Sequence, residues 1–381
     1  MVIGGGATSG NTFDETGYVY VYEGAEAIFN AKNVHLGYRV TGSKYHRGYL
    51  YVCGGRLTMS YNGARLSVGR QGNGTFEVSD GGVATINGSV AALTDSAGGR
   101  TAAVNILTNG TLKARCIESF ANAKGENDTA SLVLDGGTVI ANTSAATSFI
   151  GGFTAAVIGI GGATVDTAGQ NLTIAQSFAA REGQSATVSA TADGLAAIPA
   201  FTKIGAGTLT LAGDNDYLCA TCVSDGTLKA GANALPSATT LQLRGGVVDL
   251  DGNSVTVANL IGSGTVSNGT LTVTGTVWPG VIGSGTLKID ATAALNMTTL
   301  GCRIASGGAC GCLEVAGTQN LSGVTIVGEG MENRPKRGVK IVRASAISGV
   351  PAGDASLSEG RISVRGGTLR VGEPGLTVHI R

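Results

Sequence analysis

The sequence predicts an all-β protein that winds as a single-stranded parallel β-helix, a solenoid with a cap at each end. Three observations predict this fold. Glycine is abundant, at 63 of 381 residues, whereas proline is scarce, at 6. A short phrase of glycine, threonine and an apolar residue recurs along the chain and is followed by alternating apolar and polar residues. Stretches with the 3.6-residue spacing of an amphipathic helix are almost absent.

The composition suits such a coil and excludes several other classes of protein. Apolar residues make up 43% of the chain but aromatic residues only 5%, which fits a narrow interior filled by Ala, Val, Leu and Ile. Glycine has no strict third-residue period, so the chain is not collagen. The 26 basic and 26 acidic residues balance, which argues against electrostatic binding to nucleic acid or to an anionic membrane. No run of about 18 apolar residues is present, so no membrane insertion is expected.

The repeated phrase marks where strands begin. Its glycine supplies backbone freedom for a corner, and the alternation after it describes a strand with one buried face. The phrase begins at Gly74, Gly110, Gly137, Gly207, Gly226, Gly264, Gly269, Gly285 and Gly367. Between residues 200 and 290 it returns after roughly 16 to 20 residues, which is one coil turn that pairs with the turns above and below it. Two antiparallel sandwiches or jelly rolls are the competing fold, but they would bring more proline and larger core aromatics.

The chain divides into three segments by residue type. Residues 1–62 are rich in tyrosine and are expected to form an N-terminal cap with the first turns. Residues 63–330 carry the β-helix repeats, and residues 331–381 are expected to end the coil as capping strands. The stretch 116–127 has a helical appearance that ends at Gly125. The opening residues are not a signal peptide, and we expect the chain to be a piece of a longer secreted protein.

One stretch, GAGTLTLAGDNDYLCATCVSDGTLKAGANALP at 205–236, strongly resembles the autotransporter-associated β-strand repeat of bacterial passenger domains. The matching positions are Gly205, Gly207, Thr208, Leu209, Leu211, Gly213, Asn215, Tyr217, Thr221, Val223, Gly226, Thr227 and Leu228. Cys219 and Cys222 depart from the family, which usually has Gly and Thr there. Residues 66–82 look like the same class of repeat.

This resemblance implies a right-handed parallel β-helix that is secreted or held at the cell surface. The family is associated with adhesion and surface structure and shares no catalytic residues. We therefore expect an extracellular, adhesin-type structural stalk that is not an enzyme and that needs no cofactor or metal.

Tyrosines gather near the start of the chain, where eight of the nine precede residue 62. Tyr18, Tyr20 and Tyr22 alternate with valines, so they share one face of a strand. Amphipathic rings of this kind suit sugars or a protein partner. The candidate ligand-binding residues are Tyr18, Tyr20, Tyr22, Tyr38 and Tyr45, with His35 and His46 in the same region. The expected partners are glycans or cell-surface proteins, and self-association is left open. The alternative to a binding surface is a tyrosine stripe that covers the first turn of the coil.

The seven cysteines include two close groupings. One zinc ion cannot join Cys222 to Cys310, because 88 positions separate them, which is about four coil turns. A redox Cys-x-x-Cys pair would need a helix after Cys222. The candidate disulfide-forming residues are Cys219, Cys222, Cys302, Cys310 and Cys312, and Cys302 has either Cys310 or Cys312 as its partner across a glycine turn. Buried thiols that act as small apolar filler are the alternative.

Two carboxylate pairs, Asp214 with Asp216 and Asp249 with Asp251, lie two residues apart and could serve as acid and base. The simpler interpretation is corner residues that hydrogen-bond their own backbone. A polysaccharide lyase or hydrolase on a β-helix is therefore one alternative function, and a viral tail fibre or spike segment is another. A basic patch is interpreted as solvated surface, with contact to an anionic glycan as the lesser alternative; it comprises Arg334, Lys336, Arg337, Lys340 and Arg343.

Overall fold

The structure of the protein is a computed structural model. It describes residues 1–3, 16–38, 46–94, 99–120, 127–143, 148–183, 200–280, 284–333, 335, 338–353 and 361–372. Its contacts gather into two compact units. Unit 1 comprises Met1–Ser185 with Pro199–Leu218, and unit 2 comprises Ala186–Ile198 with Cys219–Arg381. Each unit is a coil of mostly parallel strands, so the predicted parallel β-helix is confirmed. The predicted division into a cap, repeats and capping strands stays a prediction.

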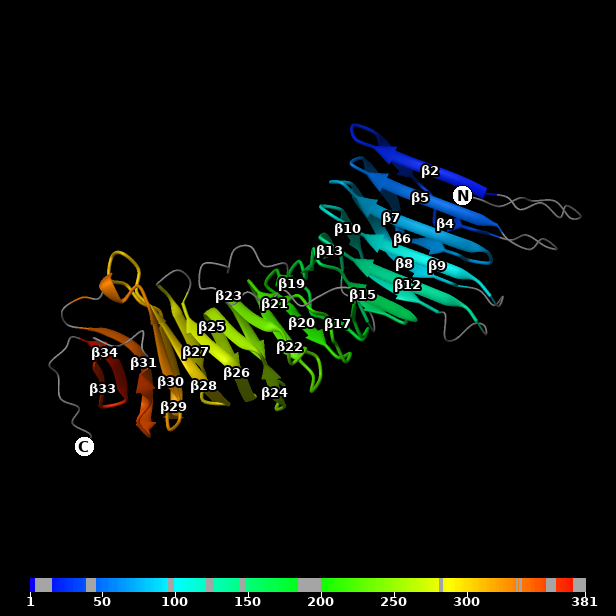
Figure 1. Cartoon of the computed structure of the whole chain (residues 1–381). Coiled ribbons are helices and arrows are strands. Elements are labelled where there is room, and N and C mark those ends of the chain that lie inside the picture. The colour runs from blue at the N-terminus through cyan, green and yellow to red at the C-terminus, as the bar shows by residue number, and fades with distance from the viewer. Residues whose placement is uncertain are drawn as a thin grey trace, which may run out of the picture. The chain divides into compact units, whose positions relative to one another are not determined.

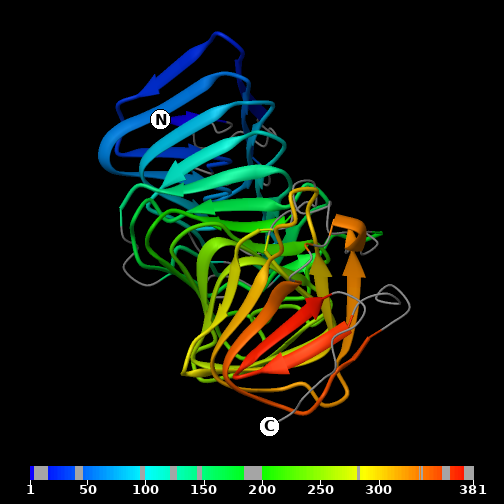
Figure 2. The same cartoon turned by 90° about the vertical axis from the view of Figure 1, so that its left-hand side faces the viewer.

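Unit 1 has three faces, and each turn contributes one strand to each face (Figures 1 and 2). Face 1 consists of β2 (Thr16–Tyr22), β5 (Arg47–Cys53), β7 (Asn73–Ser79), β9 (Thr101–Ile106), β12 (Thr129–Leu134), β15 (Ala155–Ile158) and β18 (Ala179–Ala180). Face 2 consists of β3 (Glu26–Phe29), the first parts of β6 (Arg56–Val68) and β8 (Val83–Ala92), then β10 (Thr111–Ala114), β13 (Gly137–Ala141), β16 (Ala163–Asp166) and β19 (Ala200–Ile204). Face 3 consists of β1 (Val2–Ile3), β4 (Asn33–Leu36), the second parts of β6 and β8, then β11 (Cys116–Ser119), β14 (Ile150–Gly151), β17 (Leu172–Ile174) and β20 (Thr208–Leu211).

The core of unit 1 is built by stacking like positions of successive turns. On face 1 the register aligns Leu50 with Phe76, Phe76 with Val104, and Val104 with Leu132. All four side chains are fully buried, because alternate residues of a strand point to the same side. The glycine-cornered alternation seen in the sequence therefore produces continuous apolar columns.

The turns of unit 1 are longer than one repeat phrase suggests, and they differ in length. Val157 pairs with Ala179 in the next turn, whereas Ala163 pairs with Phe201, which lies much further along the chain. The stretch 116–127, which had a helical appearance only as far as Gly125, begins as a strand, because Cys116–Ser119 form β11 and pair with β8. Residues 121–126 lie outside the described residues.

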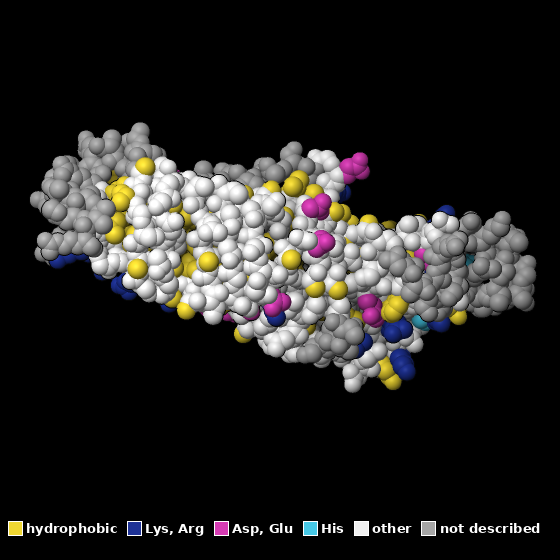
Figure 3. Space-filling view, turned by 90° about the horizontal axis from the view of Figure 1, so that it is seen from below, with side chains coloured by type: hydrophobic (Ala, Val, Ile, Leu, Met, Phe, Trp, Pro, Cys, Tyr) yellow, Lys and Arg dark blue, Asp and Glu magenta, His cyan; other side chains and the backbone are white. Residues whose placement is uncertain are grey.

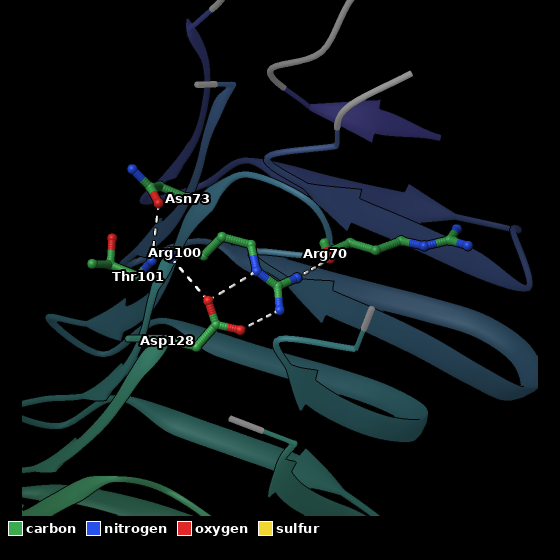
Figure 4. Close-up of polar contacts among 5 residues, drawn as sticks. All are labelled: Arg70, Asn73, Arg100, Thr101 and Asp128. Carbon is green, nitrogen blue, oxygen red and sulfur yellow. Dashed lines mark hydrogen bonds and ion pairs between the residues drawn. The ribbon is translucent and has the colours of Figure 1, made fainter. Parts of the chain in front are cut away.

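A buried ion pair fastens one corner of unit 1 (Figure 4). The Asp128 carboxylate accepts hydrogen bonds from the backbone N–H of Arg100 at 2.9 Å, from its Nε at 3.2 Å and from its Nη2. Arg100 Nη1 also donates to the carbonyl of Arg70 at 2.6 Å, and the Thr101 N–H donates to Asn73 Oδ1 at 2.9 Å. Three successive turns are thus joined where the strands β7, β9 and β12 begin.

Aromatic side chains also occupy the interior of unit 1, although the low aromatic content favoured a core of small residues. The fully buried rings include Phe76, Phe149, Phe178, Phe201 and Tyr217. Phe201 lies between Phe178 and Tyr217, with ring centroids 6.3 and 5.8 Å away. These distances are those of favourable aromatic pairs, so three rings pack as a cluster in the last turns of the unit.

Unit 2 repeats the architecture with shorter turns at its start. Its strands are β21 (Ala220–Val223), β22 (Thr227–Ala230), β23 (Thr240–Asp249), β24 (Ser254–Val257), β25 (Asn259–Ser267), β26 (Gly269–Pro279), β27 (Thr286–Ile289), β28 (Ala293–Arg303), β29 (Cys312–Asn320), β30 (Thr325–Glu329), β31 (Val339–Ser348), β32 (Ala352–Gly353), β33 (Arg361–Arg365) and β34 (Thr368–Gly372). A single 3₁₀ turn, η2 (Met331–Asn333), is the one helical element among the described residues. The turn from Ser254 to its partner Thr270 is little more than half as long as the turn from Leu313 to its partner Val342.

The last strands of unit 2 reverse direction. β33 and β34 form an antiparallel pair, and β34 pairs antiparallel with β31. A strand that runs against the coil interrupts the parallel ladder, which is one way to protect a sheet edge from adding further strands.

Candidate recognition surface and thiol cluster

The tyrosines of β2 lie on the outer side of face 1. Tyr18, Tyr20 and Tyr22 are 56%, 49% and 60% exposed, whereas Val21 between them is buried. The strict alternation of TGYVYVY explains this placement, because successive side chains of a strand point to opposite faces. The strand face that these tyrosines share is therefore the outer one, and the rings do not fill the coil.

Rings of the next strand extend this row into a two-strand array, which we call the Tyr ladder (Tyr18, Tyr20, Tyr22, Tyr49 and Tyr51). The register of β2 and β5 places Tyr18 beside Tyr49 and Tyr20 beside Tyr51. The ring centroids are 4.7 and 5.0 Å apart, with interplanar angles of 10° and 12°. Along the strands, successive rings are 5.6–6.2 Å apart and within 9° of parallel. Parallel stacking in both directions holds the rings in fixed places.

Next to the Tyr ladder, the following strands of face 1 carry polar side chains on the same outer side. Tyr51 aligns with Glu77 on β7, and Glu77 accepts a hydrogen bond from Asn105 on β9 at 3.2 Å. Partial burial, with smaller effects of Tyr20 and Glu77, raises the pKa of the Tyr51 hydroxyl above its ordinary value. Like any tyrosine, Tyr51 is protonated at neutral pH, and its hydroxyl can donate a hydrogen bond. The surface combines aromatic rings with donors and a carboxylate.

Tyr38 belongs to a separate cluster with His35 and Arg70. Its ring lies 5.4 Å from the His35 ring, and the Arg70 guanidinium lies 4.8 Å over the Tyr38 ring centroid. Arg70 Nη1 is 2.9 Å from His35 Nε2. Because an arginine can only donate, His35 Nε2 is the acceptor of this bond. The cluster borders a pocket of about 200 Å³ that Arg65 also lines.

The sequence did not indicate that Arg70 contacts Tyr38 or that Arg65 lines a pocket with His35 and Arg70. Arg65 lies beside Asn33 in the register of β4 and β6, an offset that no repeat phrase predicts. Tyr45, the fifth predicted ligand-binding residue, lies outside the described residues. His46 is buried, so it is not an exposed recognition residue, and His379 lies outside the described residues.

The two carboxylate pairs serve corners of the coil. Asp249 Oδ1 accepts from the backbone N–H of Asp251 at 2.8 Å, and the Asp251 carboxylate pairs with Lys229 at 2.9 Å. Asp214 and Asp216 are exposed on either side of Asn215, which is buried. Hydrogen bonds of an aspartate to its own backbone two residues on are typical of turns.

Asn215 forms the centre of its corner. Its Oδ1 accepts from the Phe178 N–H at 2.8 Å, and its Nδ2 donates to the Gly213 carbonyl at 3.1 Å. This one side chain therefore joins its own corner to the preceding turn and satisfies backbone groups that burial would otherwise leave without partners.

The cysteines that sequence reasoning grouped have different surroundings. Cys219 and Cys222 are buried in the coil, and Cys222 Sγ is 3.5 Å from the Ser224 hydroxyl. Cys302 and Cys310 face each other, with their sulfur atoms 3.3 Å apart. Of the two candidate partners of Cys302, which are Cys310 and Cys312, the fold places Cys310 within 3.3 Å of it, sulfur to sulfur. No disulfide bond joins any of the seven cysteines, all of which the structure describes, so the disulfides stay predictions.

Other kinds of site are not evident in the described part of the chain. Among the described residues, no three His, Cys, Asp or Glu side chains gather in a way that could hold a metal ion. No helix there is both long and apolar enough to cross a membrane. On the face seen in Figure 3, charged side chains of both signs are scattered over a mostly uncharged surface. The sequence has equal numbers of acidic and basic residues.

The fold and the surface define the class of protein: a parallel β-helix that displays a rigid aromatic array. Residues 201–230 match the model of the passenger-associated-transport-repeat family. This match confirms the predicted resemblance to autotransporter passenger repeats over that segment, which includes Asn215 and Tyr217. A search of the curated proteins and a search of the solved structures found no match.

Proposed function

We propose that the chain is a passenger-type β-helix, secreted or exposed at the cell surface, that works as a structural, adhesin-like stalk and binds glycans through the Tyr ladder. The passenger repeat at residues 201–230 supports the export and display of the chain. The single observation that carries the binding function is the exposure of Tyr18, Tyr20 and Tyr22 in one ordered row. Large exposed apolar groups in a fixed array mark interaction sites in soluble proteins.

The chemistry of the row favours an extended carbohydrate. A sugar ring has an apolar C–H face that packs on an aromatic ring, and its hydroxyl groups match the phenol groups at the ring tips. Stacked tyrosines lose little conformational entropy when a ligand binds, because the coil already orders them. Successive rings are 5.6–6.2 Å apart, so contact with three of them needs several linked sugars.

The absence of catalysis is part of the proposal. Both pairs of aspartates that could act as acid and base occupy coil corners, and Asp249 and Asp251 already have backbone or lysine partners. The alternative is a polysaccharide-cleaving enzyme. New reducing ends or unsaturated uronates after incubation with acidic polysaccharides would establish that alternative. A trimer in sizing experiments would favour a viral fibre or spike segment instead.

Glycan-array binding with matched tyrosine variants tests the proposal. The triple variant Tyr18→Thr, Tyr20→Thr, Tyr22→Thr keeps residues that favour strands but removes the exposed row. Tyr61→Thr is the control, because Tyr61 is 44% exposed but does not belong to the Tyr ladder. We expect at least a roughly tenfold loss of affinity for the triple variant and no change for the control. Equal binding by wild type and triple variant would remove the proposed role of the ladder.

A further inference from the structure

Three cysteines gather where the chain passes from β28 to β29. Ile304 and Cys310 form an antiparallel bridge, and the Ala305 N–H donates to the Ala309 carbonyl at 2.8 Å. Cys302 lies two residues before Ile304, and its sulfur atom reaches diagonally across the hairpin to within 3.3 Å of the Cys310 sulfur atom. A disulfide bond is about 2.05 Å long, so the two sulfur atoms are a little more than about 1 Å from bonding distance.

The two thiols differ in access to solvent. Cys302 is buried, whereas Cys310 is half-buried and lines an open pocket of about 400 Å³. The hydrogen bond from Cys302 lowers the pKa of Cys310 below the ordinary thiol value, and the same contact and burial raise the pKa of Cys302. The thiol that a dissolved disulfide can reach is therefore also the one that ionises first, and a thiolate is the attacking species in exchange.

The pocket carries an excess of positive charge among its described residues. Lys340, Arg343 and Arg370 line it together with one carboxylate, Glu314, which pairs with Arg343 at 3.1 Å. Three cations against one carboxylate favour a ligand with negative charge. Cys312 lines the same pocket, but burial raises the pKa of its thiol, with a smaller effect of Glu314.

We propose that Cys302 and Cys310 form an intramolecular disulfide by exchange with a carboxylate-bearing low-molecular-weight disulfide that enters this pocket. The Cys310 thiolate attacks one sulfur of the incoming disulfide, forms a mixed disulfide and releases one thiolate, which takes up a proton. Cys302 then loses its proton and attacks the Cys310 sulfur. The protein disulfide forms, and the second small thiol leaves. The two cysteines lose two electrons in total, and the incoming disulfide gains them.

Peptide mapping of the full chain tests this assignment. The reduced protein is treated with glutathione disulfide, quenched with acid at intervals and digested without reduction. We expect a peptide pair linked through Cys302 and Cys310, and an early mixed disulfide on Cys310. Linkage of Cys302 to Cys312, or recovery of Cys302 and Cys310 as free thiols throughout, would overturn the proposal.

Three cysteine variants test the order of attack. Cys302→Ser is expected to accumulate the glutathione adduct on Cys310, because no thiol remains to resolve it. Cys310→Ser is expected to leave Cys302 unmodified, and Cys312→Ser is the control that oxidises at the wild-type rate. An adduct on Cys302 in the Cys310→Ser variant, or arrest of oxidation in Cys312→Ser, would contradict the assigned roles. The wild-type time course gives the same answer if a variant fails to fold.

The charge of the oxidant tests the role of the pocket. Glutathione disulfide carries carboxylates, whereas cystamine is a cationic disulfide of the same kind. The double variant Lys340→Gln, Arg370→Gln is expected to oxidise roughly tenfold more slowly with glutathione disulfide and no more slowly with cystamine. Equal slowing with both oxidants would show that the pocket charge does not select the oxidant.

Discussion

The buried pair of Arg100 and Asp128 provides the sharpest test of how unit 1 is held together. We consider Asp128→Asn, which keeps the size of the side chain but removes its charge. The wild-type carboxylate accepts three hydrogen bonds from Arg100, and neither side chain is exposed. The variant would leave a buried guanidinium without its counter-charge and with an amide N–H directed at its donors. Breaking a buried ion pair in this way costs about 3–5 kcal/mol.

Hydrogen exchange followed by mass spectrometry is the appropriate assay, because the single tryptophan lies in unit 2. A loss of about 3 kcal/mol corresponds to a roughly 100-fold fall in protection for peptides that cover β9 and β12. Arg181→Gln is the matched control. It breaks an ion pair with Asp135 in the same unit, but Arg181 is 62% exposed, and such pairs contribute about 0–1 kcal/mol.

A further variant separates the charge from the packing. If Arg100 and Asp128 are replaced together by Met and Leu, no buried charge remains, and part of the lost protection should return. The return is incomplete because the Arg100 N–H and the Arg70 carbonyl lose these hydrogen-bond partners. The reasoning is refuted if Asp128→Asn and Arg181→Gln lower protection equally, or if the apolar double variant is less protected than Asp128→Asn.

Three further predictions concern other corners and one thiol. Asn215→Ala removes a buried side chain that bonds two backbone groups, so we expect about 1–3 kcal/mol lower unfolding free energy, against less than about 0.5 kcal/mol for the exposed Asp214→Ala. Gly88→Ala places a Cβ 1.9 Å from a carbonyl oxygen of the neighbouring turn, whereas Gly317→Ala meets nothing within 4 Å; calorimetry should show a lower melting temperature for the first alone. Burial, with a smaller effect of a neighbouring glutamate, raises the pKa of Cys116 to about 11, so iodoacetamide labelling of Cys116 should rise with pH mainly above 10. The free energy of unfolding should fall between pH 9 and 11, because the thiol ionises at lower pH in the unfolded chain than in the folded one. Ready labelling of native Cys116 at pH 8, where an ordinary thiol is about one-quarter ionised, would contradict the burial.

The sequence predicted the strands and their direction because both follow from local patterns. Alternation placed Tyr18, Tyr20 and Tyr22 on one face of a strand, and their exposure shows that this face is the outer one. Repeated glycine corners predicted a coil, and the parallel pairings confirm it. These features need only the two-residue period of a strand and the backbone freedom of glycine.

The sequence could not predict which residues stack across turns, because that depends on the length of each turn. The offset between paired residues in unit 1 is not constant, being short from Val157 to Ala179 and long from Ala163 to Phe201. The neighbours Arg65 and Asn33 therefore could not be matched from the repeat. The contact of Arg70 with Tyr38 has the same origin. The contact of Cys302 with Cys310 is diagonal across the hairpin, because Cys310 bridges Ile304, and the glycine turn alone could not select it over Cys312.

Hydroxyl-radical footprinting of the tyrosines, with and without a glycan selected on the array, tests the central claim most directly. The account predicts fast oxidation of Tyr18, Tyr20 and Tyr22 in the free chain and slow oxidation of Tyr217, which is 1% exposed. The glycan should protect the Tyr ladder and leave Tyr61 unchanged. A ladder that is already protected in the free chain, or a glycan that protects Tyr61 in its place, would contradict the account.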